Sequence, residues 1–329
     1  MERMPDFELS HPATYAEAAA LLAAEPGARL LAGGTDLVPN LRRGLGRPAR
    51  LVDLGSVRGQ PEIETGAAEW VLGAGLTLAC MARDPRFDGA CAALGEAARA
   101  AAGPGHRTVA TLGGNLFQDT RCVFYNQSEW WRQTNGWCLK RDGDTCHVAP
   151  QGARCHAAFS GDLAPALIAL GAQAELLSVR GRRRLALADC YRDDGAAHLT
   201  PERDEVLTRV LFATPAPGAR SGYRKARVRG AMDFPLAGVA CSLRLQGGAM
   251  VALRVALTGT NSQPLLLQGT EALLGRPLDD AGLAALGKLV QKQVGPMRTT
   301  VTPSNYRRQV AAVLAQRLVA ELAGVVVPA

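Results

Sequence analysis

The chain has 329 residues, which is enough for two or three domains and long for a single core. Hydrophobic residues make up 47% and charged residues 20%, so the composition excludes a disordered or fibrous chain. The formal net charge is +7, but the basic residues form short scattered groups with no basic stripe interleaved with aromatics, which argues against a nucleic-acid surface. A mildly basic surface suits an acidic protein partner at least as well.

The sequence predicts neither a membrane span nor a secretion signal. No segment reaches 18 continuous apolar residues. Near the start, Glu2, Asp6 and Glu8 stand where a secretion signal needs a basic end and an apolar middle. We therefore expect a protein of the reducing cytoplasm.

The sequence pattern of residues 1–55 predicts a first small unit of β-α-β-α-β type. Thr14 followed by Glu17 is a capping-box pattern, which opens an Ala/Leu-rich helix that ends near Pro26. The other expected elements are the strand 7–9, the strand 29–32, the helix 37–43 and the strand 51–54.

Between the strand 29–32 and the helix that follows lies the turn Gly33-Gly34-Thr35-Asp36. Free N–H groups and the helix dipole favour a phosphate at such a place, and two glycines let the backbone approach it closely. An ordinary turn with Thr or Asp as N-cap explains the same four residues. The pattern is not the G-x-G-x-x-G of a Rossmann dinucleotide site.

Residues 56–178 predict a second unit, which contains a second glycine turn. A strand at 70–75 and an Ala-rich helix at 91–102 come first, and Gly103-Pro104-Gly105 ends the helix. The second turn covers Thr111 to Asn115, and a helix after residue 162 and a strand at 174–179 complete the unit. Two phosphate-type turns, one in each unit, indicate a diphosphate held between two domains.

The segment 110–162 carries four of the eight cysteines, with the spacing C-x15-C-x7-C-x8-C. It has no long apolar run, so it cannot order itself by burying side chains, and we expect Cys122, Cys138, Cys146 and Cys155 to close on one centre. Two disulfides suit an oxidising compartment, which the expected location argues against. Zinc usually shows close C-x2-4-C pairs, and an iron–sulfur cluster tolerates wider spacing on a folded scaffold.

Spacing alone leaves zinc and iron–sulfur nearly equal, and four unrelated thiols are a further alternative. The remaining cysteines lie in apolar or strand-like contexts, and we expect inert core thiols at Cys80, Cys91, Cys190 and Cys241.

Residues 179–329 predict a third, α+β unit. Its expected strands are 205–212, 222–228, 236–245 and 250–257, and its expected helices are 280–294 and 303–322. Thr302 is the expected N-cap of the last helix, with Pro303 at its first position. No nucleophile elbow, H-E-x-x-H pair or P-loop occurs, which favours a chain that moves electrons and leaves bond breaking to a partner.

Four stretches carry a resemblance to a known family. In order they are LLAGGTDLVPNLRRG, ATLGGN, SGDLAPAL and YRKARVRGAMDFPLAG. The chain resembles, over essentially its whole length, the FAD-binding subunits of the molybdenum hydroxylase family, which includes xanthine dehydrogenases and carbon monoxide dehydrogenase. The resemblance implies an α+β fold with two α/β subdomains around FAD and a C-terminal α+β domain.

The resemblance also implies which residues hold FAD. The first turn would contribute Leu31, Ala32, Gly33, Gly34, Thr35, Asp36 and Leu37, and the second would contribute Thr111, Gly113, Gly114 and Asn115. Asp162 and Lys225 fall at positions that the family uses near the flavin, with Tyr223 and Arg227 as weaker candidates. The structural alternatives are an N-cap role for Asp162 and a solvated charge for Lys225.

Most members of the family lack the cysteine segment, and its sequence resembles the insertion found in reductive members. This resemblance implies a [4Fe-4S] cluster on the four cysteines of the segment. It implies electron flow from reduced ferredoxin, through the cluster and FAD, to a small [2Fe-2S] subunit and a large molybdenum-cofactor subunit in a dimer of heterotrimers. The implied reaction removes the phenolic hydroxyl of 4-hydroxybenzoyl-CoA.

Two alternatives stay open on the sequence. An oxidative hydroxylase subunit keeps the flavin and reverses the electron flow. A basic, zinc-stapled nucleic-acid-binding protein accounts for the cysteines and the charge, although the two glycine turns argue against it.

Overall fold

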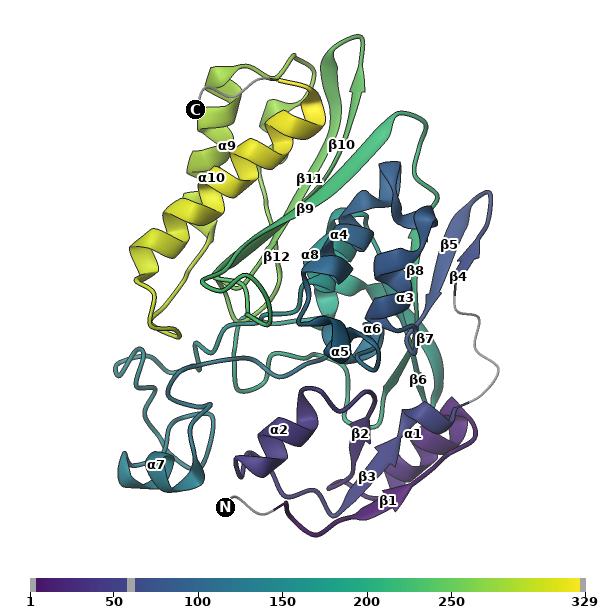
Figure 1. The fold of residues 1–329 in the computed structure, drawn as a ribbon, viewed down its shortest axis with the longest axis vertical. Coiled ribbons are helices and arrows are strands. Elements are labelled where there is room, and N and C mark those ends of the chain that lie inside the picture. The colour runs from purple at the N-terminus through teal and green to yellow at the C-terminus, as the bar shows by residue number, and fades with distance from the viewer. Residues whose placement is uncertain (1–3, 58–62, 326–329) are drawn as a thin grey trace.

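The computed structural model describes residues 4–57 and 63–325 of the chain and contains three separate sheets (Figure 1). The expected α+β class is confirmed. In the described part of the chain, no helix combines the length and the apolar character that a membrane crossing requires.

The first sheet is parallel, with the order β1-β3-β2. Its strands are β1 (Glu8–Ser10), β2 (Arg29–Leu31) and β3 (Arg50–Asp53), and its helices are α1 (Tyr15–Ala24) and α2 (Leu37–Arg42). Thr14 caps α1 as expected, because its hydroxyl accepts the Glu17 N–H at 3.1 Å. Parallel pairing brings the carboxyl end of β2, and hence the first glycine turn, to one edge of the sheet.

The second sheet has the order β4-β5-β8-β6-β7, and its neighbours are antiparallel. The strands are β4 (Ile63–Thr65), β5 (Glu69–Gly73), β6 (Gln173–Ser178), β7 (Gly181–Ala186) and β8 (Val206–Ala213). The helices of this region are α3 (Leu78–Arg83), α4 (Ala92–Ala100), α5 (Pro104–Arg107), α6 (Leu112–Leu116) and α8 (Leu163–Ala169). Both β7 and β8 follow residue 179, so the expected boundary there does not coincide with the end of a sheet.

The third sheet has the order β12-β11-β10-β9 and is also antiparallel. Its strands are β9 (Ala219–Ala226), β10 (Ala237–Gln246), β11 (Ala249–Thr258) and β12 (Leu265–Leu266). Helices α9 (Asp280–Gln293) and α10 (Ser304–Ala323) cover one face, and α4 and α8 pack on the other (Figure 1). The second and third sheets are thereby joined through α4 and α8, whose small apolar side chains belong to the largest core cluster.

The cysteine segment leaves this body as one excursion. Its two ends meet where Arg121 and Ala158 exchange backbone hydrogen bonds of 2.7 Å. Between them the one regular helix is α7 (Glu129–Thr134), which lies at the lower left of Figure 1 beside α2. The excursion therefore rests against the first unit, although it belongs to the second in sequence.

Two local expectations are wrong, and one strand was not expected. The last helix begins at Ser304 with Pro303 as its N-cap, so Thr302 does not cap it. Cys80 is exposed, in contrast to the buried Cys91, Cys190 and Cys241. The basic run at residues 182–184 forms the edge strand β7, where its side chains pair with acidic residues; the pairs are Arg182–Glu175 at 2.9 Å, Arg183–Glu205 at 2.5 Å and Arg184–Glu69 at 3.4 Å.

Candidate functional site

The first glycine turn presents free backbone amides at the end of β2. Gly34 has a φ of +70°, which favours glycine. A Cβ atom on Gly33 would lie 1.9 Å from the carbonyl oxygen of Val109, so the backbone there tolerates no side chain. No acceptor among the described residues is within hydrogen-bond reach of the amides of Gly33, Gly34 or Thr35. Unpaired amides beside a helix start are suited to hold a phosphate.

The second glycine turn faces the first, but its amides are already used. The Thr111 hydroxyl accepts the Gly114 N–H at 3.1 Å, and the Gly113 N–H donates to the Ala74 carbonyl at 2.8 Å. A Cβ atom on Gly114 would lie 3.7 Å from the Cβ atom of Ala32 in the first turn. The second turn therefore forms an opposing wall of backbone, while the free amides come from the first.

The side chain that caps α8 comes from Asn115, and not from Asp162, which lies directly before the helix. The Asn115 side chain accepts the Leu163 N–H at 3.0 Å and so caps α8. Asp162 stands at the N-cap position of α8, as the structural alternative expects, but its side chain makes no capping bond there. Its carboxylate instead accepts the Tyr223 hydroxyl at 2.6 Å and lies 3.0 Å from the Lys225 ammonium.

The Asp162–Lys225 pair is buried, with 6% and 3% of the two side chains exposed, so Lys225 is not a solvated charge. Lys225 also donates to the Ala100 carbonyl at 3.2 Å, and Arg227 does so at 3.3 Å. Burial, together with the neighbouring carboxylate, raises the pKa of the Tyr223 phenol well above its ordinary value. A protonated phenol and an ammonium thus share one carboxylate next to the second turn.

The four cysteines of the segment line one cavity. Cys122, Cys138, Cys146 and Cys155 are all buried free thiols, and their side chains line the same small cavity. The rest of the lining is mainly apolar and comprises Phe124, Tyr125, Leu139, Lys140, His147, Val148 and Ala157. The tryptophans of the segment, Trp130, Trp131 and Trp137, are not part of this lining.

The chemistry of the thiols suits a metal centre that displaces protons. Burial raises the pKa of the Cys122 thiol, and it raises the pKa of Cys155 to about 12. Both thiols are therefore protonated at neutral pH until a metal replaces the protons. The Ala157 N–H already points at the Cys155 Sγ at 3.4 Å, as a donor to a thiolate ligand would.

The four thiols do not form a preset metal site. Within residues 4–57 and 63–325, no group of three His, Cys, Asp or Glu side chains is placed to hold a metal ion. The thiols share one cavity, and this arrangement by itself favours neither zinc nor an iron–sulfur cluster.

Buried arginines hold the segment in place of an apolar core. Arg132 is 2% exposed and donates to the Gln127 carbonyl and, at 2.8 Å, to the Arg43 carbonyl at the end of α2. Its Nε and the Nδ2 of Asn126 are buried and have no acceptor among the described residues. The Oδ1 of Asn126 accepts the Cys122 N–H at 3.0 Å. Donors without partners beside the cysteines indicate a missing electron-rich group.

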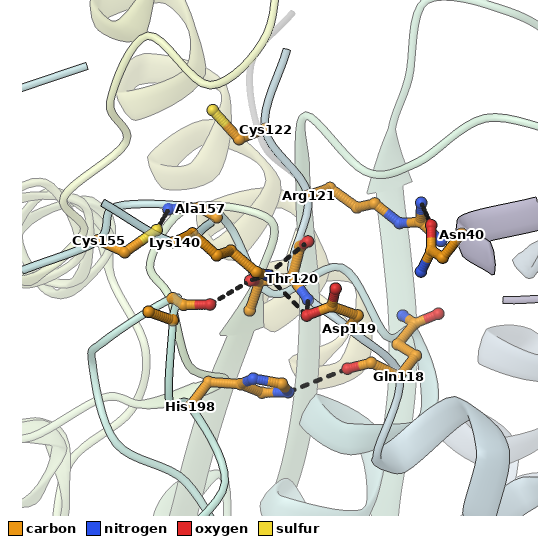
Figure 2. Close-up of polar contacts among 12 residues, drawn as sticks. Asn40, Gln118, Asp119, Thr120, Arg121, Cys122, Lys140, Cys155, Ala157 and His198 are labelled. Carbon is orange, nitrogen blue, oxygen red and sulfur yellow. Dashed lines mark hydrogen bonds and ion pairs between the residues drawn. The ribbon is translucent and has the colours of Figure 1, made fainter. Parts of the chain in front are cut away.

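The same segment contacts the first glycine turn. Arg121 pairs with the Asp36 carboxylate and donates to the Asn40 side chain at 3.2 Å (Figure 2), and the Asp119 N–H donates to Asp36 at 3.0 Å. Burial lowers the pKa of Arg121 to about 10, so it is charged at neutral pH. Sequence reasoning missed these charged residues, although charges in a segment without an apolar run are a usable signal.

Comparisons with known proteins agree on one family. Residues 5–215 match the model of the FAD binding domain in molybdopterin dehydrogenase, and residues 221–322 match the CO dehydrogenase flavoprotein C-terminal domain. The chain is 29% identical over 324 residues to the putative xanthine dehydrogenase FAD-binding subunit XdhB of Escherichia coli K12, covering 97% of each chain. It is 31% identical over 285 residues to the aldehyde oxidoreductase FAD-binding subunit PaoB of the same strain, covering 83% of this chain and 87% of PaoB.

Solved structures give the same result. A reconstituted CO dehydrogenase from Oligotropha carboxidovorans matches with a TM-score of 0.80 and 26% identity, over 98% of this chain and 100% of the other. The Cu,Mo-CO dehydrogenase in its cyanide-inactivated form matches with a TM-score of 0.80 and 25% identity, over 98% and 99%.

Proposed function

The chain belongs to the FAD-binding subunits of the molybdenum hydroxylase family, and from this premise we propose that it is the electron-transfer subunit of an oxidoreductase whose substrate chemistry takes place on a partner. The fold and the FAD-binding role follow from the family. The partners we propose are a large subunit with a molybdenum cofactor and a small [2Fe-2S] subunit.

The observation that carries the flavin site is the pair of facing glycine turns. The unpaired amides of Gly33, Gly34 and Thr35 would bind the pyrophosphate. Gly114 has no side chain, which leaves space between the two facing turns. Lys225, fixed by Asp162, would lie by the flavin ring and favour negative charge on it. Bound FAD supplies electron exchange in single or paired steps.

We further propose that Cys122, Cys138, Cys146 and Cys155 hold a [4Fe-4S] cluster. Support comes from the convergence of four buried thiols on one cavity and from the unpaired donors beside them. The cavity walls keep water away, and the Ala157 N–H would stabilise the Cys155 thiolate. A cluster of this kind supplies one-electron exchange at a potential set by its surroundings.

The direction of electron flow has two candidates. The cysteine cavity favours the reductive one, in which the enzyme is 4-hydroxybenzoyl-CoA reductase and yields benzoyl-CoA and water. There this subunit stands between reduced ferredoxin and the subunits with [2Fe-2S] and molybdenum. An added single-electron centre of low potential has little use in ordinary hydroxylation.

The oxidative candidate is favoured by the comparisons. The relatives found are subunits of xanthine, aldehyde and CO dehydrogenases or oxidoreductases. A subunit with the same flavin site then receives electrons from a substrate and hands them onward. The nucleic-acid-binding alternative is set aside, because both halves of the chain match models of flavoproteins.

One experiment tests both levels of the proposal. The complex is purified anaerobically and analysed for flavin, iron, zinc and subunits, and is then assayed for benzoyl-CoA formation with reduced ferredoxin and for xanthine or aldehyde oxidation. We expect one FAD per chain, and about four irons per chain in addition to the iron of the small [2Fe-2S] subunit. Absence of flavin would overturn the flavin site, and zinc in place of iron would overturn the cluster. Oxidation of xanthine or aldehyde without benzoyl-CoA formation would select the oxidative candidate.

A further inference from the structure

A buried lysine lines the four-thiol cavity. It is Lys140, whose side chain is only 5% exposed. Its Nζ lies 2.6 Å from the Asp119 carboxylate and 3.2 Å from the Thr120 carbonyl (Figure 2). The same atom lies 4.3 Å from the centre of the Tyr125 ring. These contacts from three neighbouring residues fix one position for the charge.

The ion pair has a direction. Lys140 is part of the cavity wall, whereas Asp119 is not, and 30% of the Asp119 side chain is exposed. The pair therefore meets the cavity through the residue that carries the positive charge, and not through Asp119.

A fixed charge at this place changes the energy of a redox centre. A [4Fe-4S] cluster on four thiolates carries net negative charge, which increases by one on reduction. In a poorly solvated cavity, a nearby cation stabilises the more negative state, and a nearby anion opposes it.

We propose that Lys140 raises the reduction potential of the four-cysteine centre and that Asp119, with the opposite charge, lowers it. This inference rests on the proposed cluster. The Asp119 backbone also donates to Asp36 in the first glycine turn, so the pair lies between the two cofactor sites. Lys140 and Asp119 are thus tuning residues of the centre, although neither supplies a ligand.

The test uses two substitutions with opposite expected effects. In the intact complex, Lys140→Met removes the cation and leaves Asp119 near the centre, so the midpoint potential should fall. Asp119→Asn leaves the cation unopposed, so the potential should rise. A tenfold change in the reduction equilibrium corresponds to about 59 mV for one electron, and we expect at least this shift for Lys140→Met. Potentiometric titration followed by electron paramagnetic resonance measures it.

Lys140→Arg keeps the charge and should stay near the wild-type potential. Lys288→Met removes an exposed charge from α9 and is the matched control, with no shift expected. If Lys140→Met does not retain iron, Asp119→Asn decides alone: a rise supports the proposal, and a fall or no change overturns it.

Two failures are distinguishable. A wild-type complex without iron overturns the cluster proposal and this inference together. Iron-containing variants that keep the wild-type potential, or that shift in the same direction, overturn this inference and leave the cluster in place.

Discussion

The two glycine turns and the cysteine cavity lie side by side but are built in different ways. The turns are positioned by backbone: β2 delivers the first turn to a sheet edge, and Gly33 approaches the carbonyl of Val109 so closely that only glycine fits. The cavity is positioned by side chains, chiefly buried arginines that donate to carbonyl groups.

This difference teaches where each site is robust. A turn at a strand end is held in place by the sheet, so the proposed flavin site needs few side-chain contacts to position it. The cysteine segment has one short helix and a small cluster of buried residues, and it depends on polar contacts that must all be made. Two buried donors in this segment, the Nε of Arg132 and the Nδ2 of Asn126, have no acceptor among the described residues.

The largest expected effect tests whether the two regions are separable. Cys138→Ser should remove about four irons per chain, because a hydroxyl is a poor ligand for iron, while the iron of the small [2Fe-2S] subunit and most of the FAD stay bound. Metal and flavin analysis of the anaerobically purified complex measures both. Cys80→Ser, at an exposed thiol, is the control and should keep both cofactors. Equal loss of iron and FAD from Cys138→Ser would show that the regions form one site.

The converse change tests the turns. Gly114→Val would place methyl groups between the facing turns, where a Cβ atom is already 3.1 Å from the Thr111 hydroxyl. We expect FAD affinity to fall at least about tenfold, which is about 1.4 kcal/mol, with iron unchanged. Flavin fluorescence titration gives the affinity. Gly105→Val is the control, since nothing lies within 4 Å of its Cβ position; unchanged FAD binding in Gly114→Val would remove this turn from the site.

The contact between the two regions is the next target. Arg121→Met leaves the Asp36 carboxylate without its guanidinium and should lower the free energy of unfolding by about 2 to 3 kcal/mol. Denaturant unfolding of the chain measures this. Arg47→Met breaks an exposed pair with Glu129, 71% and 42% exposed, and should change stability by less than about 1 kcal/mol. Equal effects from the two would mean that the regions are not coupled through Arg121.

The smallest expected effect is a pH dependence at the base of the segment. The Nε2 atom of His198 lies 3.0 Å from the Gln118 carbonyl oxygen, and burial lowers the pKa of the imidazole to about 4. The unfolded chain takes up this proton near pH 6.5 and the folded chain does not. This contribution to stability is therefore full above pH 6.5 and is lost as the pH falls toward 4.

We expect His198→Gln to flatten that part of the stability profile, by at most about 1.4 kcal/mol per pH unit. Thermal unfolding between pH 4 and pH 7 measures the effect, with His11→Gln at the surface as the control. An unchanged slope in His198→Gln would show that the imidazole is protonated in the folded protein.

Local pattern was enough to predict the backbone-built region. The strand before Gly33, the capping box at Thr14 and the helices that close the chain all follow from the sequence, because each depends on neighbours in the chain. The convergence of the four cysteines was predicted from the lack of an apolar core in their segment.

The partners of charged side chains were not predictable. Nothing near Asp36 in the sequence indicates that Arg121, 85 residues later, pairs with it, and Lys140 gave no sign that it lines a cavity. The edge strand β7 was missed because its arginines find their carboxylates on other strands. Such contacts depend on which distant segments the fold brings together.

The neck at which Arg121 and Ala158 exchange hydrogen bonds has a consequence for how the segment is attached. Opposed residues that exchange such bonds lie about 5.5 Å apart, so a tight turn of a few residues is enough to replace everything between them. No strand of the three sheets lies between the two residues in the described chain. The segment can therefore be shortened or exchanged at this neck without altering a strand of the scaffold.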